Sequence, residues 1–560
     1  MADNIPIKKS FIVEDEQLIP LGLTNFRGEL TKFGIKAKDR RRHMYIIGQT
    51  GTGKTTIMEN MAIADIKNGS GLGIIDPHGE FADLMLDYVP EERIKDVVYF
   101  NPSDLDWPIS FNVMENVAPE SRHLISSGLM AVFKKIWPDV WSARMEYILN
   151  NTLLALLEYP ETTLLSINRM LSDKNYRQVV VDYVKDPMVK SFWVNEFANY
   201  NEKYAQEAVA AIQNKIGQFI SNPLIRNIIG QRQSKINLRE IIDNGKILIV
   251  NLSKGLIGED NSALLGAILI TELQLAAMSR VNVPEAERPD FYLYVDEFQN
   301  FSTDSFANIL SEARKYHLNL IMAHQYVAQL NDTVRDAIIG NVGTTVLYRL
   351  GIEDAMYFEN ECERQFSAID ISNLPNFNFY MRLMVDGYIS EPFSGINIPP
   401  FDRVKFNNRE KIKEYSRHLY SDKREEVEKT ISDWSLYNYG LDIDDPAEVN
   451  DVSSVRSSGN AKEKEKTRWV TKCSLCAKPI SVPFEPDPNR PVYCAECLEK
   501  IKNGEVEALD TVTKNVIPAS FTARQNKHTG NEKTSATNHP NKQKVDTKKL
   551  KNILDTILGK

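Results

Sequence analysis

Apolar and polar positions follow two different patterns along the chain. Short, mostly apolar runs bounded by polar turns occupy residues 44–47, 72–75, 97–100, 247–251, 291–295, 318–322 and 344–348. Segments with helical spacing separate most of these runs. Strands that alternate with helices predict an α/β fold built on a doubly wound, mainly parallel sheet.

The stretch 118–235 interrupts this alternation with helix after helix. Ile212, Ile216, Phe219 and Ile220, for example, are spaced to form one buried helical face. We interpret the stretch as an all-helical subdomain inserted into the sheet domain. On this interpretation the sheet domain comprises residues 40–117 and 236–440, and residues 1–39 form a short lead-in.

The chain becomes polar after residue 440. Residues 441–466 lack periodicity and aromatic side chains, which is typical of a linker. A cysteine-containing module follows at 467–502 and a low-complexity tail at 503–546. Residues 547–560 carry an apolar stripe at helical spacing, which predicts an amphipathic helix that either packs on its own domain or docks on a partner.

Charge and hydropathy restrict the class of protein. The formal net charge of −9 over 560 residues argues against a wholly basic nucleic-acid binder, although a motor that touches phosphates only along a pore remains compatible with it. No apolar run approaches the roughly 20 residues that span a bilayer. The first residues lack the layout of a signal peptide. We therefore expect a cytoplasmic protein without an integral membrane segment.

The strongest chemical pattern is a glycine-rich loop between the first apolar run and an amphipathic helix. It fits the phosphate-binding loop of nucleotide hydrolases. Its backbone N–H groups would wrap the β-phosphate, Lys54 would neutralise the β- and γ-phosphates, and the Thr55 hydroxyl would ligate Mg²⁺. The residues predicted to bind ATP here are Gly48, Gln49, Thr50, Gly51, Thr52, Gly53, Lys54, Thr55 and Thr56.

Two carboxylates follow the apolar run 291–295. This places Asp296 and Glu297 at the carboxyl end of a buried strand, the edge at which open α/β sheets bind ligands. Asp296 is predicted to hold Mg²⁺, and Glu297 to polarise the attacking water. The pair indicates an enzyme that hydrolyses ATP.

Further polar residues sit at the ends of other predicted strands. They are Asp76, His78 and Glu80 after one run, His324 and Gln325 after another, and Arg314 and Lys315 before it. Together with the loop and the Asp–Glu pair, they resemble the HerA/FtsK superfamily of hexameric DNA-pumping ATPases. Within it, residues from about 22 to 400 look most like the conjugative coupling ATPases of type IV secretion, the TraG/TraD type.

This resemblance implies a RecA-like fold with an all-α insertion and roles for several residues. Gln325 would be the polar sensor of the γ-phosphate, and Asp76 would belong to the nucleotide site. Arg314 matches the arginine finger that acts in the neighbouring subunit, with Arg349 as the competing candidate. A homo-oligomer, expected to be a hexamer, follows because each site then needs a residue from next door.

The resemblance implies an ATP-driven translocase that moves DNA through a central pore, in conjugative transfer or DNA processing. Its phosphate contacts would be largely independent of sequence. The chain departs from coupling proteins in lacking their N-terminal membrane helices and in carrying His78 where they often have lysine. Two alternatives are an ATPase that energises protein secretion or apparatus assembly, and a nucleotide-gated binding scaffold.

Four of the five cysteines form two tight pairs. Cys473, Cys476, Cys494 and Cys497 follow a C-x2-C-x17-C-x2-C pattern. In a reducing compartment such pairs are usually metal ligands, and four thiolates suit tetrahedral Zn²⁺. We expect a structural zinc ribbon that, with the C-terminal helix, recruits type IV secretion or DNA-processing partners at the inner face of the membrane. Cys362 is expected to be a buried thiol.

Overall fold

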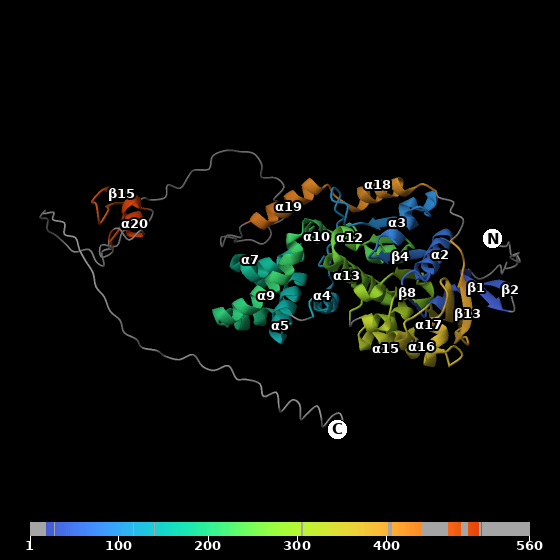
Figure 1. Ribbon diagram of the computed structural model, residues 1–560. Coiled ribbons are helices and arrows are strands. Elements are labelled where there is room, and N and C mark those ends of the chain that lie inside the picture. The colour runs from blue at the N-terminus through green and yellow to red at the C-terminus, as the bar shows by residue number, and fades with distance from the viewer. Residues whose placement is uncertain are drawn as a thin grey trace, which may run out of the picture. The chain divides into compact units, whose positions relative to one another are not determined.

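The computed structural model describes residues 18–26, 29–115, 117–138, 141–303, 306–400, 406–437, 469–482, 491–502 and 506 (Figure 1). The chain divides into two compact units, Met1–Asp444 and Asp445–Lys560. The predicted linker 441–466, the helix 547–560 and all of the tail 503–546 except Val506 lie outside the described residues.

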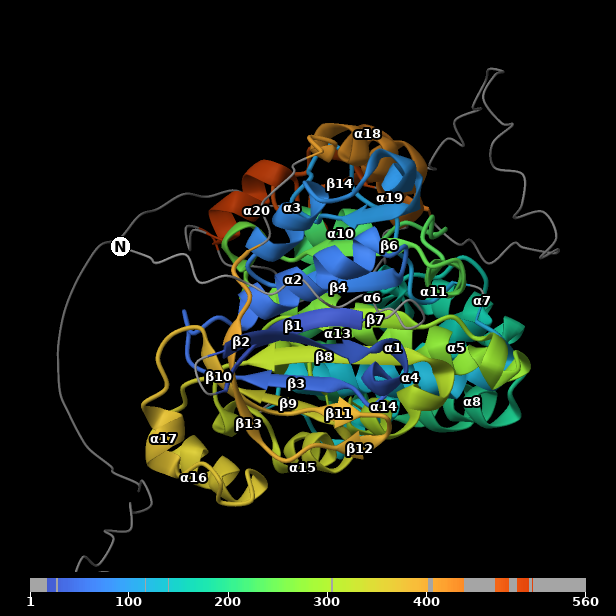
Figure 2. The ribbon, with the colours of Figure 1, turned by 90° about the vertical axis from the view of Figure 1, so that its right-hand side faces the viewer.

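The first unit is built on an 11-stranded sheet with the order β2-β1-β13-β10-β9-β3-β8-β7-β4-β6-β5. From β9 to β5 all neighbouring strands are parallel. These parallel strands coincide with the apolar runs of the sequence, and Figure 2 shows them side by side. They are β3 (Met44–Ile47), β4 (Gly71–Asp76), β5 (Val97–Phe100), β6 (Ile247–Asn251), β7 (Phe291–Val295), β8 (Leu318–His324) and β9 (Thr344–Leu347). The prediction of a mainly parallel α/β sheet is confirmed.

Antiparallel strands extend the sheet beyond β9. They are β1 (Leu18–Phe26), β2 (Glu29–Lys36), β10 (Asn378–Arg382) and β13 (Phe393–Asn397). Residues 18–36, which the sequence analysis assigns to a lead-in, are therefore part of the sheet. Ile19, Leu21 and Leu23 alternate toward the core, but glycine, proline and polar residues between them weaken the pattern that marks the central strands.

Each central strand divides its side chains between two apolar layers. Met44 and Ile46 join one core with α2 (Lys54–Lys67), α3 (Glu80–Leu86) and α18 (Arg409–Tyr420). Tyr45 and Ile47 join the other. Helices of the second layer and its connections are α11 (Leu238–Asp243), α12 (Lys254–Ile257), α13 (Glu259–Met278), η5 (Ser279–Asn282), η6 (Glu285–Glu287), η7 (Phe298–Asn300), α14 (Phe306–Glu312), η8 (Ala313–Tyr316), η9 (Val327–Gln329), α15 (Asp332–Asn341), α16 (Ile352–Glu361) and α17 (Ala368–Ser372).

Every regular element between Pro119 and Ile229 is helical, as predicted. In Figure 1 these helices gather at the end of the unit away from β1 and β2. α4 packs on α13, so the insertion shares one continuous core with the sheet. The helices are η2 (Pro119–Ser121), α4 (Arg122–Ile136), α5 (Ala143–Glu158), α6 (Leu165–Ser172), α7 (Lys174–Tyr183), α8 (Pro187–Ser191), η3 (Phe192–Glu196), η4 (Phe197–Asn199), α9 (Glu202–Ser221) and α10 (Pro223–Ile229).

One helical stretch among the described residues, Glu259–Asn282, is long and apolar enough to cross a membrane. Of its most apolar window, 67% is buried inside the protein. It comprises α13 and η5 and contributes Leu264, Leu265 and Ile268 to the core beneath the sheet. These contacts are those of the central helix of a packed core.

The remaining elements are short. In the first unit they are α1 (Ala37–Arg40), η1 (Glu91–Asp96), the hairpin β11 (Met384–Val385) and β12 (Tyr388–Ile389), and α19 (Arg424–Leu436). In the second unit they are the hairpin β14 (Trp469–Lys472) and β15 (Pro479–Val482), followed by α20 (Ala495–Lys502).

Candidate active site

The glycine-rich loop connects β3 to α2 at the carboxyl edge of the sheet. Gly51 and Gly53 have φ angles of 75° and 117°, which L side chains rarely adopt. A Cβ on Gly53 would lie 2.5 Å from Nδ2 of Asn397, so the loop approaches its neighbour too closely for a side chain. α2 begins at Lys54, so the free N–H groups of its first turn face the hollow of the loop.

Lys54 folds back over this loop. Its ammonium donates to the carbonyl oxygens of Gly48 at 2.8 Å and Gln49 at 3.2 Å. Burial lowers the pKa of Lys54, and the carboxylates of Glu297 and Asp296 oppose that shift. Lys54 and the two acids therefore lie in one site.

Asp296 and Glu297 end β7 at the same edge. Burial, with Asp76 and Glu297 nearby, raises the pKa of Asp296 to about 6, against the opposing effect of Lys54. Glu297 is 7% exposed and has a φ of 46°, a left-handed conformation that few non-glycine residues adopt. Its backbone N–H donates to the Asp296 carboxylate at 3.0 Å.

Two amide side chains hold the Glu297 carboxylate. Gln325, at the end of β8, donates from Nε2 to Oε1 at 2.8 Å, and Gln299 donates from Nε2 to Oε2 at 2.6 Å. The structure thus brings the predicted sensor into direct contact with the predicted catalytic carboxylate. The sequence analysis did not identify Gln299, whose signal is only its place two residues after the Asp–Glu pair.

Asp76 ends β4, next to β7, and is fully buried. Its carboxylate accepts hydrogen bonds from the backbone N–H groups of His78 at 2.8 Å and Ala82 at 3.0 Å. These contacts fix the start of α3. Asp76 therefore acts on the site through its charge beside Asp296, since both of its oxygens are engaged by backbone.

The two candidate arginines lie at opposite edges of the sheet. Arg349 follows β9 and donates from Nε to the side-chain oxygen of Gln49 at 3.1 Å, so it belongs to the phosphate loop of its own chain. Arg314 lies in η8, before β8, at the amino edge, and is exposed. It lines an open pocket of about 320 Å³ together with Lys38, Arg41, Glu285 and Asp386, among others.

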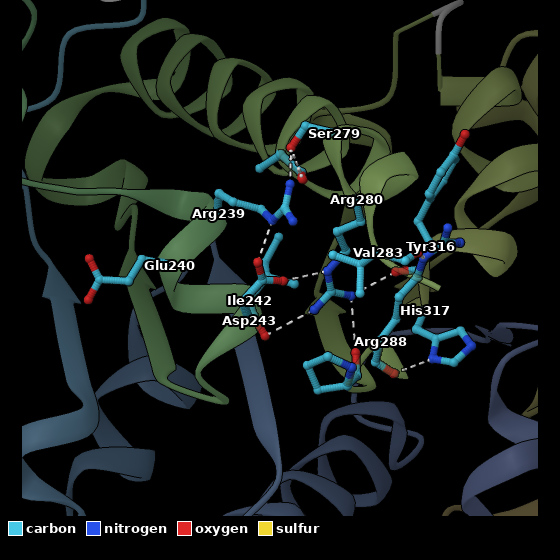
Figure 3. A network of polar contacts seen from close by, with 12 residues as sticks. Arg239, Glu240, Ile242, Asp243, Ser279, Arg280, Val283, Arg288, Tyr316 and His317 are labelled. Carbon is cyan, nitrogen blue, oxygen red and sulfur yellow. Dashed lines mark hydrogen bonds and ion pairs between the residues drawn. The ribbon is translucent and has the colours of Figure 1, made fainter. Parts of the chain in front are cut away.

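A buried polar network holds the segment that carries Arg314 (Figure 3). Arg280, which is fully buried, donates to the carboxylate of Asp243 at 2.7 Å and to the carbonyl oxygens of Tyr316 at 2.7 Å and Pro289 at 3.0 Å. Arg288 donates to the carbonyl oxygen of Lys315. The network ties α11, η5 and the starts of β7 and β8 together.

Asn397 connects the distant strand β13 to the phosphate loop. Its Nδ2 donates to the carbonyl oxygen of Gly53 at 2.9 Å, and its Oδ1 accepts from the hydroxyl of Tyr348 at 2.5 Å. Sequence reasoning missed both residues, because no pattern near the loop indicates that a residue 344 positions after Gly53 contacts it.

The four cysteines of the second unit converge. Their sulfur atoms all lie within 4.8 Å of one another. A tetrahedral site with Zn–S bonds of about 2.3 Å requires sulfur atoms roughly 4 Å apart, so the set fits zinc. Cys473 and Cys476 flank a tight turn after β14, whereas Cys494 and Cys497 lie at the start of α20. The second cysteine pair, Cys494 and Cys497, lies at the beginning of a helix. The expected zinc ribbon therefore has the hairpin-and-helix arrangement of a treble clef.

Comparison with protein-family models gives two matches. Residues 28–359, more than half of the chain, match the type IV secretion-system coupling protein DNA-binding domain. Residues 466–502 match a probable treble clef zinc finger. The family predicted from the sequence and the zinc-binding module are confirmed. A search of curated proteins finds no match.

Solved structures with similar folds include the plasmid coupling protein TrwB in complex with a non-hydrolysable GTP analogue. It is 16% identical, with a TM-score of 0.49, and the match covers 66% of this chain and 89% of TrwB. VirB4 of Thermoanaerobacter pseudethanolicus is 15% identical, with a TM-score of 0.45, and the match covers 70% of this chain and 99% of VirB4.

Proposed function

This chain belongs to the family of the type IV secretion-system coupling protein DNA-binding domain, and from that premise we propose that it is an ATP-hydrolysing motor that moves DNA. The observation that carries the proposal is the convergence of Lys54, Asp296, Glu297 and Gln325 at one edge of the sheet. A scaffold that only binds nucleotide has no need of a carboxylate held at both oxygens.

In this proposal the loop 48–56 would hold the phosphates of ATP, and Thr55 and Asp296 would hold Mg²⁺, which would supply positive charge against the β- and γ-phosphates. Glu297 polarises a water molecule and accepts its proton as the water oxygen bonds to the γ-phosphorus. The bond to the bridging oxygen breaks, and ADP and phosphate are released.

Gln325 couples ATP hydrolysis at Glu297 to movement of the segment that follows β8. It joins the end of β8 to Glu297 on β7 through one hydrogen bond. Loss of the γ-phosphate changes what surrounds Glu297, and Gln325 transmits the change to the segment after β8. That segment continues through η9 to α15.

The opposite placement of Arg314 supports a ring. Arg314 is exposed at the amino edge, opposite the edge that carries its own phosphate loop, so a nucleotide that it contacts would belong to a neighbouring subunit. We propose a homohexamer with Arg314 as that residue. Arg349, which contacts Gln49, serves its own site.

One observation favours a second candidate, an ATPase that drives protein secretion. Acids of the same chain balance part of the positive charge before β3. Lys36 and Lys38 share the single carboxylate of Asp386, and Arg41 pairs with Asp290. These pairings reduce the positive charge that this segment offers to DNA.

The deciding experiment compares ATP turnover of the wild type with that of Glu297→Gln, each with single-stranded DNA, double-stranded DNA or neither, at low salt. We expect DNA to raise wild-type turnover. Glu297→Gln should bind ATP normally and lose at least roughly a hundredfold in turnover, as general-base variants do. Wild-type turnover that no DNA changes would reject the DNA track and favour the second candidate.

We propose that the zinc module recruits partners and leaves the chemistry to the first unit. Cys473→Ser should release zinc, measured by a chromogenic chelator, because only three thiolates remain. ATP turnover without DNA should stay within about twofold of the wild type, since no catalytic side chain lies in the second unit as far as it is described. Loss of that turnover would contradict the separation.

A further inference from the structure

An aromatic side chain stands beside the phosphate loop and is not used by the catalytic groups. Phe377 lies in the turn between α17 and β10, and is 49% exposed. The neighbouring rings of Tyr348 and Phe379 are fully buried. Its Cδ1 is 3.1 Å from the point that a Cβ on Gly53 would occupy, so the ring directly borders the loop.

The backbone fixes this ring relative to the loop. The N–H of Phe377 donates to the carbonyl oxygen of Thr52 at 2.8 Å, and its carbonyl oxygen accepts from the N–H of Asn397 at 2.8 Å. Its φ is 66°, a left-handed conformation that is unusual for a bulky residue. The two backbone hydrogen bonds therefore hold the Phe377 ring in a fixed place beside the loop.

Strand order sets the direction in which a bound nucleotide leaves the loop. Gln325 and Glu297 lie at the ends of β8 and β7, on one side of β3, and define the γ-phosphate end. On the other side of β3 lie β9 and then β10. The base and ribose must therefore extend toward that second side, where Arg349 and Phe377 border the loop.

We propose that Phe377 is the platform on which the base of the bound nucleotide stacks. This inference rests on the proposed ATP site and specifies the part of the ligand that the phosphate loop does not hold. Every base presents a π face, so a phenyl platform accepts purines without reading their edges. The site therefore does not distinguish the bases by their edges, and it takes ATP and GTP with similar affinity.

The test measures binding to the full-length protein by calorimetry, with Mg²⁺ and non-hydrolysable analogues of ATP and GTP, and separately with inorganic tripolyphosphate. Variants are Phe377→Leu, Phe377→Tyr and a matched control, Tyr388→Leu, which removes an exposed aromatic ring from the β11–β12 hairpin. Phe377→Leu should bind both analogues roughly tenfold more weakly, in line with base–aromatic stacking. Its affinity for tripolyphosphate should be unchanged.

Phe377→Tyr and Tyr388→Leu should bind the analogues like the wild type. Equal weakening of analogues and tripolyphosphate by Phe377→Leu would overturn the inference, because the ring would then act through the shape of the loop. Unchanged binding of both analogues would overturn it as well. A wild type that binds neither analogue nor tripolyphosphate would overturn the proposed function, and the inference with it.

Discussion

The two edges of the parallel sheet use charged residues in opposite ways. At the carboxyl edge, Asp76, Asp296 and Glu297 are buried side by side and share one cation, Lys54. At the amino edge and beneath it, buried arginines are paired with acids of their own: Arg40 with Asp65 and Arg280 with Asp243, both at 2.7 Å. The first edge keeps an excess of like charge that a metal–nucleotide complex can neutralise. At the second edge, acids of the same chain already neutralise the buried arginines.

Backbone strain does not separate the two edges. Glu297 is left-handed at the carboxyl edge, but His43 and His317 are left-handed at the amino edge. Charge pairing is therefore the better indicator of which edge binds a ligand. Arg314 at the amino edge differs from these paired arginines, because it is exposed, in a segment that the buried Arg280 and the half-buried Arg288 hold through its backbone carbonyl groups.

The largest expected effect is on ATP turnover and comes from removing the exposed Arg314 side chain. Arg314→Ala should lower ATP turnover by about a thousandfold, because a trans-acting arginine stabilises transition-state charge by that order. ATP affinity should change little. Lys315→Ala is the matched control, since it removes an adjacent exposed cation. Steady-state turnover of purified rings measures both variants.

Mixed rings show where Arg314 acts. Inactive Arg314→Ala subunits mixed with inactive Glu297→Gln subunits should regain turnover. In such rings a site with an intact Glu297 can lie next to a subunit with an intact Arg314. No recovery from the mixture would place the function of Arg314 within its own subunit and contradict the proposed ring geometry.

A smaller effect is expected from breaking the paired network. Arg280→Leu leaves the carbonyl oxygens of Tyr316 and Pro289 and the Asp243 carboxylate without their buried donor. The free energy of unfolding should fall by about 3 kcal/mol, as when one partner of a buried pair is removed. Arg424→Leu breaks an exposed pair with Glu428 and should cost under about 1 kcal/mol. Urea unfolding measures the free energy of unfolding of both variants. Equal losses in the two variants would contradict the interpretation that the arginines of the amino edge are neutralised within the fold.

The sequence predicted the carboxyl edge well for a physical reason. In a parallel sheet the ends of separate strands meet at one edge, so locating each apolar run also locates the polar residues after it. Asp296 and Glu297 are located in this way, whereas Lys54 follows from the glycine-rich loop and the role of Gln325 from the family resemblance. Their contacts, including the hold of Gln299 on Glu297, depend on side-chain directions that no spacing encodes.

The sequence does not reveal the antiparallel extension of the sheet, because its strands lack the apolar runs that mark the central strands. β1 and β2 precede the phosphate loop. β13, with which β1 pairs, lies more than 350 residues after β1 in the sequence. Their half-buried strands carry mixed patterns instead of continuous apolar runs. Asn397 and Phe377 reach the phosphate loop only through this late return of the chain, so local sequence patterns could not reveal them.

The smallest expected effect has the opposite sign. Asp296→Asn should raise the free energy of unfolding of the protein without metal or nucleotide, and this small change in stability is the effect meant here. Burial and the charges of Asp76 and Glu297 raise the pKa of Asp296 from 3.8 to about 6 in the folded state. An asparagine removes this charge and keeps an oxygen that can accept the N–H of Glu297, now 3.0 Å from Asp296 Oδ1.

The size of the effect depends on pH. Below about pH 3 Asp296 is protonated in both states, so the substitution changes little. Between pH 4 and 6 the unfolded chain ionises first, which favours unfolding of the wild type. Above pH 6 the carboxyl is ionised in the folded state as well, and the wild type has lost all the stability that this group can cost it. The variant should then be more stable than the wild type by about 2 kcal/mol, given 1.36 kcal/mol per pKa unit and partial relaxation of the site. Urea unfolding in a chelator at pH 4 and pH 7.5 measures the difference. A variant less stable than the wild type at pH 7.5 would mean that Lys54 already compensates the acids, and that the carboxyl edge is as saturated as the amino edge.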